Sequence, residues 1–204
     1  MRFPYIVLAA VLLLGSCLDP KKASDSNFKK AIQAKLDKES VCITAMAPEK
    51  LADVGGKHSS TPMIDSLVAL GMIAGHPITI IDKDFGFTSS RPGMEYVITE
   101  KGKQFERADK NAGMSLGGGS YTSLCSGKKE VVDIVRYSEP SAMMGQTISQ
   151  VTYTYKITDL ASWMRDPAFL KAYPVDLRAA DAPVEAKMGL ILMSDGWRVP
   201  DSLF

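Results

Sequence analysis

Residues 147–157 read TISQVTYTYKI, a dense run of β-branched and aromatic side chains. Residues of these types favour strands. Alternate positions from Val151 to Ile157 are apolar or aromatic, whereas the positions between them are polar. This alternation is typical of a strand whose sheet packs on one side only. We therefore predict a long strand here, with one face against a core.

The segments around this strand predict a small α+β domain with an antiparallel sheet over residues 121–204. Residues 130–137 (EVVDIVRY) alternate like a second strand, and residues 160–173 (LASWMRDPAFLKAY) have a helical pattern. Residues 188–193 (MGLILM) predict a buried strand, followed by a tight turn at Ser194-Asp195-Gly196. The order strand, long strand, helix, strand is typical of the α+β class.

A second α+β unit is expected over residues 27–110. Phe28, Ile32 and Leu36 recur at helical spacing under a lysine-rich outer face, which is either a solvated surface or a membrane-binding patch. Residues 78–81 and 94–99 predict strands on either side of a turn region at residues 85–93. The run 111–120 (NAGMSLGGGS) lacks the Gly-Lys-Ser/Thr ending of a phosphate-binding loop, so we expect a Gly-rich linker between the two units.

Two short motifs within this unit carry a family resemblance. Residues 67–73 (LVALGMI) follow the pattern LxxLGxI, and residues 96–105 (YVITEKGKQF) follow YxLTxxGxxF with Ile in place of Leu. The segment 61–107 thereby resembles the winged-helix fold, which implies a winged-helix-like N-terminal domain. Such domains often bind DNA, but the candidate recognition helix 61–71 carries no Lys or Arg. We therefore expect the motif to be structural, with no nucleic-acid partner.

The N-terminus has the pattern of an export signal. Arg2 precedes a nine-residue apolar run, Ile6 to Leu14, which as a helix spans only about 14 Å and is too short to cross a bilayer. The tetrapeptide Leu14-Gly15-Ser16-Cys17 resembles the lipobox of bacterial lipoproteins. That resemblance implies a signal peptide at 1–16, acylation of Cys17 by groups such as palmitate, and a lipidated tether at 17–26. An ordinary secretory signal and a buried N-terminal strand are the alternatives.

The same resemblance implies a location. Leu18, rather than Asp, follows Cys17. In a Gram-negative host this implies the outer membrane, with the chain facing the periplasm and held on the lipid bilayer by its acyl anchor. Removing residues 1–16 leaves 23 basic and 23 acidic residues, because Arg2 is the one charged residue removed.

Cysteine usage predicts a disulfide. With Cys17 acylated, Cys42 and Cys125 remain, and a leftover pair in an oxidising compartment usually bonds. The alternative is two separate buried thiols.

The spacings typical of a zinc site are absent from the sequence. It contains no H-x-x-x-H or C-x-x-C, and His58 and His76 are both expected in loops. We expect no cofactor, no metal and no enzymatic activity. The remaining classes are a binding or adaptor lipoprotein, with an envelope protein or small ligand as partner, and a structural envelope component. Five aromatic residues are either a ligand or partner surface or part of the core: Tyr153, Tyr155, Trp163, Tyr173 and Trp197.

A second resemblance covers residues 120–200. The stretches VTYTYKITDLASWM (151–164) and LILMSDGW (190–197) resemble small periplasmic proteins associated with carbapenem resistance in enterobacteria. This implies an antibiotic-resistance-associated periplasmic protein as an alternative function.

Overall fold

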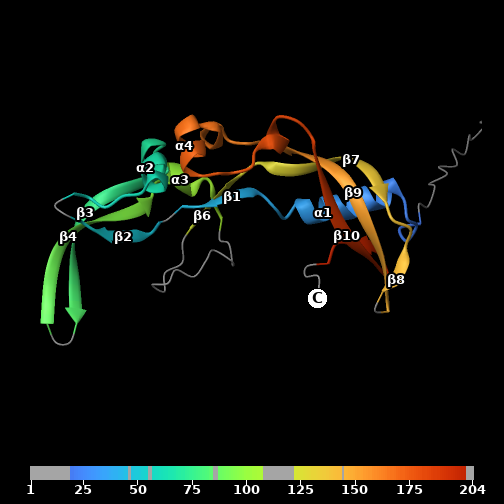
Figure 1. Cartoon of the computed structure of the whole chain (residues 1–204), viewed down its shortest axis with the longest axis horizontal. Coiled ribbons are helices and arrows are strands. Elements are labelled where there is room, and N and C mark those ends of the chain that lie inside the picture. The colour runs from blue at the N-terminus through green and yellow to red at the C-terminus, as the bar shows by residue number, and fades with distance from the viewer. Residues whose placement is uncertain are drawn as a thin grey trace, which may run out of the picture.

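The computed structural model describes residues 19–45, 47–54, 57–84, 87–107, 122–143 and 145–200. The signal peptide, Cys17 and the Gly-rich linker expected from the sequence lie outside these residues. The described chain contains helices and antiparallel sheets and belongs to the α+β class. It is elongated, with one large sheet toward one end and a long β-hairpin at the other (Figure 1).

The large sheet contains the long strand predicted over residues 147–157. That strand is β9 (Gln146–Thr158), and its apolar face is buried while Gln150 and Lys156 are exposed. The sheet order is β11-β10-β9-β7, with β8 also paired to β9, and every pairing is antiparallel. The other strands are β7 (Lys128–Tyr137), β8 (Ser141–Met143), β10 (Val184–Met193) and β11 (Gly196–Arg198).

Helix α1 (Asp25–Leu36) covers one face of this sheet. The expected stripe is confirmed, because Phe28, Ile32 and Leu36 are all buried. The Phe28 ring meets the Trp197 ring edge to face at 4.9 Å between centroids. We call the core between helix and sheet cluster 2; it also contains Val131, Ile134, Val151, Tyr153 and Leu190.

The outer edge of β7 is closed by side chains of α1. The Gln33 Oε1 atom accepts the backbone N–H of Val131 at 2.8 Å, and its Nε2 atom donates to the Lys129 carbonyl at 3.0 Å. Lys29 donates to the Val132 carbonyl at 2.7 Å. An edge strand left open is a template for pairing with another chain. Helix α1 therefore both buries the sheet and satisfies part of its edge.

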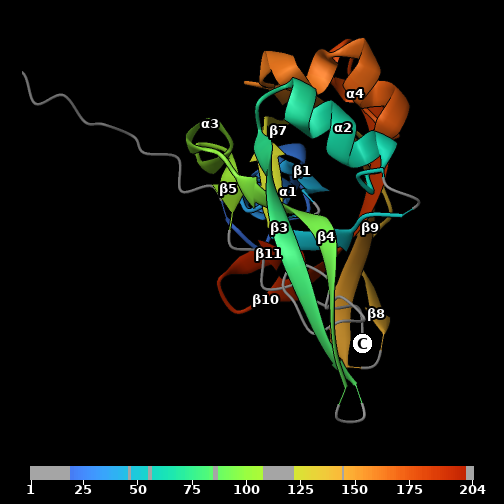
Figure 2. The same cartoon turned by 90° about the vertical axis from the view of Figure 1, so that its left-hand side faces the viewer.

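The remaining elements form a second layered body around a separate core. One sheet has the order β2-β4-β3 and another the order β1-β6-β5. The elements are β1 (Val41–Thr44), β2 (Glu49–Ala52), α2 (Pro62–Ala69), β3 (Ile73–Asp84), β4 (Phe87–Ile98), α3 (Glu100–Lys103), β5 (Glu106–Arg107), β6 (Ser123–Ser126), the 3-10 turn η1 (Ser162–Arg165) and α4 (Pro167–Ala172). A second 3-10 turn, η2 (Arg178–Ala180), instead contacts β9 of the large sheet. Figure 2 shows α2 and α4 together at one edge of this body.

The core of this body, cluster 1, combines residues that are distant in sequence. Ile64 and Leu67 of α2 lie with Phe169 of α4 and with Leu124 of β6. The expected helix at 160–173 is two short elements, because Asp166 caps α4 by accepting the N–H groups of Ala168 and Phe169. Both clusters thus contain residues from before and after the expected linker, and the linker at 111–120 stays a prediction.

The expected winged-helix domain is not supported. A wing-like hairpin does follow α2, but α1 packs on the other sheet in cluster 2, and the helix that packs on α2 is α4. A winged helix instead packs its helices together within one contiguous segment. The fold class is therefore α+β without a winged-helix unit.

The two motifs behind that resemblance meet in space. Gly71 follows α2 with φ of 69°, and the N–H of Met72 bonds the carbonyl of Leu67, as at many helix C-termini. The Thr99 hydroxyl then donates to the Gly71 carbonyl at 2.6 Å, and Lys101 donates to the Leu70 carbonyl at 2.7 Å. The motifs together cap the C-terminus of α2 and join it to the end of β4.

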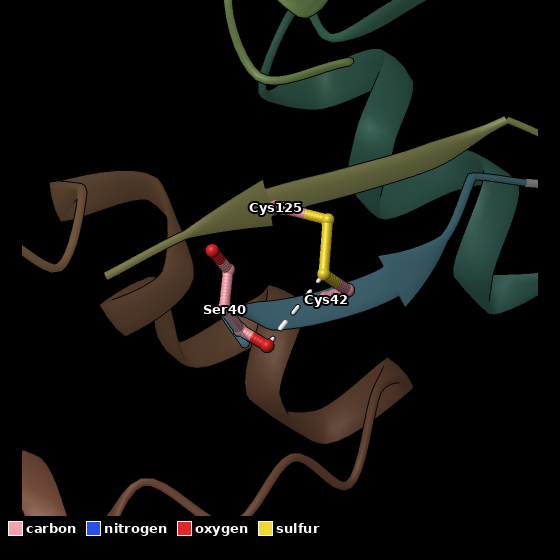
Figure 3. The surroundings of a disulfide bond; sticks show 3 residues. All are labelled: Ser40, Cys42 and Cys125. Atoms are coloured by element: carbon pink, nitrogen blue, oxygen red, sulfur yellow. Dashed lines mark hydrogen bonds between the residues drawn. A yellow bond between two sulfur atoms is a disulfide. The ribbon is translucent and has the colours of Figure 1, made fainter. Parts of the chain in front are cut away.

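The predicted disulfide is present. Cys42 and Cys125 are directly opposite in the β1–β6 pair, with 4.1 Å between their Cα atoms, and their sulfur atoms are bonded (Figure 3). The carbonyl oxygen of Ser40 lies 3.6 Å from the Cys42 sulfur. Cys42 is exposed and Cys125 is buried. The bridge therefore ties the N-terminal strand β1 to a strand 83 residues later.

Candidate functional site

Among the described residues, Phe87 is the most exposed large apolar side chain, and it lies on the outer part of the β3–β4 hairpin. We call residues 79–84 and 87–92 the arm; they lie beyond the last β2 partner, Gly93. Figures 1 and 2 show the arm projecting from the body. Within the described residues, each strand of the arm pairs with the other strand alone, and the Asp53 N–H donates to the Pro92 carbonyl at the base of the arm, at 2.9 Å. An isolated two-stranded ribbon is marginally stable in water, so its attachment to the body supports it.

The arm carries a large apolar side chain on each of its faces. Phe87 is 80% exposed and Ile81 is 60% exposed. The register pairs Ile81 with Ser90 and Asp84 with Phe87, which places Ile81 and Phe87 on opposite faces. The ion pair between Arg91 and Asp82, 2.9 Å long, links the two strands. The arm is thus a convex, two-faced projection whose outer backbone edges pair with no further strand among the described residues.

The turn predicted at residues 85–93 is wrong for 87–93, which are part of a strand. These residues form the first half of β4, and β3 begins five residues earlier than the strand expected at 78–81. His76 therefore lies on a strand, not in a loop. The close approach of β2 explains Gly93, since a Cβ there would lie 2.6 Å from the Leu51 carbonyl oxygen.

A second surface feature is a groove between α1 and the β10–β11 turn, with a volume of about 440 Å³. Its charged lining consists of Lys30, Lys35, Lys38, Arg198 and Asp195, and we call it the basic groove. Arg198 pairs with Asp195, and this hydrogen bond lowers the pKa of the Asp195 carboxyl. The lysine-rich face that the sequence predicted for α1 therefore forms one wall of a groove.

The five aromatic residues singled out from the sequence do not gather on one surface. Tyr153 and Trp197 are buried in cluster 2, and Tyr155 packs against it. Trp163 and Tyr173 are buried in cluster 1. The Tyr173 hydroxyl donates to the Thr44 carbonyl at 3.1 Å, which ties α4 to β1. Four of the five are at most 6% exposed, so their placement fits the alternative that they form the core.

Shifted ionisation in the described residues has ordinary causes. Burial raises the pKa of Tyr153 and of Tyr173 to about 12. A bidentate pair with Arg178 lowers the pKa of Asp176 to about 2, and both side chains are exposed. Tyr153 lies in cluster 2 and Tyr173 in cluster 1, and none of these groups belongs to the arm.

Side chains with the chemistry of metal ligands do not gather within the described residues. The exposed His58 lies 3.0 Å, through its Nδ1 atom, from the largely buried carboxylate of Asp53. Among the described residues, no three His, Cys, Asp or Glu side chains come close enough to hold a metal ion. The predicted lipidation site, Cys17, lies outside the described residues.

No helix within the described ranges has both the length and the apolar composition needed to cross a bilayer. Comparison with models of protein families, with curated proteins and with solved structures finds no match to this chain.

Proposed function

We propose that the chain is a lipoprotein of the bacterial cell envelope, anchored through Cys17, that acts as a non-enzymatic adaptor by presenting the arm to a partner protein. The observation that carries this proposal is the arm itself. Small-molecule sites are concave and largely apolar, whereas the arm is convex. Exposed aromatic side chains and free strand edges are features by which proteins recognise other proteins. The arm therefore favours a protein partner over a small ligand.

The ends of the molecule support an anchored arrangement. Helix α1, which begins six residues after Asp19, lies toward the end opposite the arm (Figure 1). An anchor at Cys17 would hold the molecule near α1 and leave the arm at the remote end. The disulfide agrees with export, because disulfides persist in oxidising compartments.

Site-specific cross-linking in living cells tests the adaptor role. A photo-reactive amino acid at position 87 is expected to give one discrete adduct with an envelope protein. The same amino acid at position 135 is the matched control, since Val135 is also exposed but lies on β7. Phe87→Ala should abolish the adduct formed by a second probe at position 81. Equal adducts from positions 87 and 135, or none from position 87, would contradict the adaptor role.

The anchor has its own test. Cys17→Ser is expected to prevent incorporation of radiolabelled palmitate, leaving an uncleaved precursor or a soluble species. Incorporation equal to that of the wild type would refute the lipobox interpretation without affecting the arm.

A further inference from the structure

The basic groove concentrates positive charge on a chain that is neutral as a whole from Cys17 onward. Its lining carries four basic side chains and one acidic one, a net charge of +3. The chain from Cys17 onward is neutral, so everything outside the groove carries a net charge of −3. Lys30 and Lys38 are exposed. Such a charge separation turns a molecule toward an anionic surface.

The first described residues are fixed beside this groove. The Trp197 indole N–H donates to the Lys21 carbonyl at 3.0 Å. Asn27 of α1 donates to the carbonyls of Asp19 and Lys22, at 2.8 and 2.9 Å. Pro20 lines the groove and packs on the β10–β11 turn, where a Cβ on Gly196 would lie 3.0 Å from the Pro20 carbonyl oxygen. Residues 19–22 therefore form a docked turn, although the sequence suggested a linker here.

This docked turn places the groove next to the proposed anchor. Two peptide units separate the Cα atoms of Cys17 and Asp19, and they span at most about 7 Å. An acylated Cys17 has its acyl chains in the bilayer and its backbone at the headgroup level. The rim of the groove must then lie within reach of the headgroups.

We propose that the basic groove is the face on which the protein rests on the membrane and that it binds the headgroups of anionic phospholipids. The orientation rests on the proposed anchor, but the binding chemistry belongs to the groove alone. Lysine and arginine near an anionic bilayer each strengthen binding by about fivefold. A net charge of +3 gives about a hundredfold preference for anionic over neutral membranes.

The test uses a chain begun at residue 18, which lacks the acylated cysteine. Every member of clusters 1 and 2 lies between Ala23 and Val199, so this chain retains both cores. Its binding is measured by co-sedimentation with vesicles of equimolar phosphatidylglycerol and phosphatidylcholine, and with phosphatidylcholine vesicles. At about 0.1 M salt we expect the hundredfold preference, falling as salt screens the charges.

Matched double variants locate the binding. Lys30→Gln with Lys38→Gln should weaken binding to the anionic vesicles about 25-fold. Lys83→Gln with Lys171→Gln removes the same charge from exposed positions on β3 and α4 and should change binding less than twofold. Circular dichroism confirms that each variant is folded.

The outcomes separate the groove from the anchor. Equal binding to both vesicle types, or equal losses in the two double variants, overturns the groove proposal even if palmitate enters Cys17. Groove-dependent binding to anionic vesicles supports it even if Cys17 proves unacylated, in which case the anchor fails alone.

Discussion

Replacing Gly102 by Ala tests whether the two glycine-containing motifs, 67–73 and 96–105, cap the C-terminus of α2. A Cβ at position 102 would lie 2.2 Å from the Met72 carbonyl oxygen and 2.9 Å from a methyl group of Ile98. Real Cβ atoms essentially never approach other atoms closer than 3.0 Å, so the Met72 carbonyl must move by at least 0.8 Å. That carbonyl accepts the backbone N–H of Thr99 at 3.0 Å, and the movement would weaken this bond.

The magnitude follows from three opposing contributions. Overpacking costs about 1–3 kcal/mol, and the weakened hydrogen bond costs about 1 kcal/mol more. Alanine in a helix gains back about 1 kcal/mol relative to glycine. We therefore expect Gly102→Ala to lower the free energy of unfolding by about 1–3 kcal/mol, measured by urea denaturation followed by circular dichroism. Without the clash, helix propensity alone would make this variant more stable.

The matched control is Gly145→Ala. Gly145 has φ of 77°, and no atom lies within 4 Å of the Cβ position. Its cost is the left-handed backbone alone, about 1 kcal/mol. An unchanged or increased stability of Gly102→Ala, or a loss smaller than that of Gly145→Ala, would refute the cap interpretation.

Three further predictions concern the sheet edge, the disulfide and the tyrosines. Gln33→Ala should lower the free energy of unfolding by about 2 kcal/mol, because it removes the hydrogen-bond partners of two backbone groups of β7. The control is Gln150→Ala at an exposed position on β9, and a loss from Gln33→Ala no larger than that of the control would contradict this. Replacing both Cys42 and Cys125 by Ala opens the loop of 83 residues and should lower the free energy of unfolding by about 4.5 kcal/mol by the chain-entropy relation. Reduction of the wild type should lower it by a similar amount, and a loss under about 1 kcal/mol in both cases would refute a stabilising role of the disulfide. Burial raises the pKa of Tyr173 to about 12, so the unfolded chain loses this proton first and the free energy of unfolding should fall between pH 10 and 12. Tyr173→Phe should make that fall less steep, and an unchanged slope of the free energy of unfolding against pH would contradict this.

Local pattern was sufficient where an element buries one face. The alternation of 147–157 predicted β9, and the spacing of Phe28, Ile32 and Leu36 predicted α1, because each pattern repeats with the period of the structure it forms. The turn at 194–196 was likewise recognisable from its residue types. Which helix packs on which sheet was not predictable, since α1 pairs with strands about one hundred residues later.

The arm and the groove could not be predicted from the sequence, for two different physical reasons. The arm is exposed on both faces, so it lacks alternation, and Pro92 with Gly93 resembles a turn. Pro92 lies one residue beyond the last β2–β4 pair, at the end of that ladder, where its carbonyl accepts the Asp53 N–H at 2.9 Å and a missing N–H is tolerated. The groove joins α1 to β11 from opposite ends of the chain, as in the bond between Trp197 and Lys21. No local pattern records such a contact.

The docked turn also affects how the arm of the proposed adaptor would be positioned. A flexible tether would let an arm sample a wide volume, and its reach would be set by linker length. Here residues 19–22 are bonded to α1 and to Trp197, so the fold itself fixes where the N-terminal segment leaves the body. The arm extends from the far side of the same continuous structure (Figure 1). If Cys17 is the anchor and the basic groove lies on headgroups, the packing of the two cores and the disulfide set the position of the arm. A partner would then meet Phe87 and Ile81 at a defined place relative to the membrane.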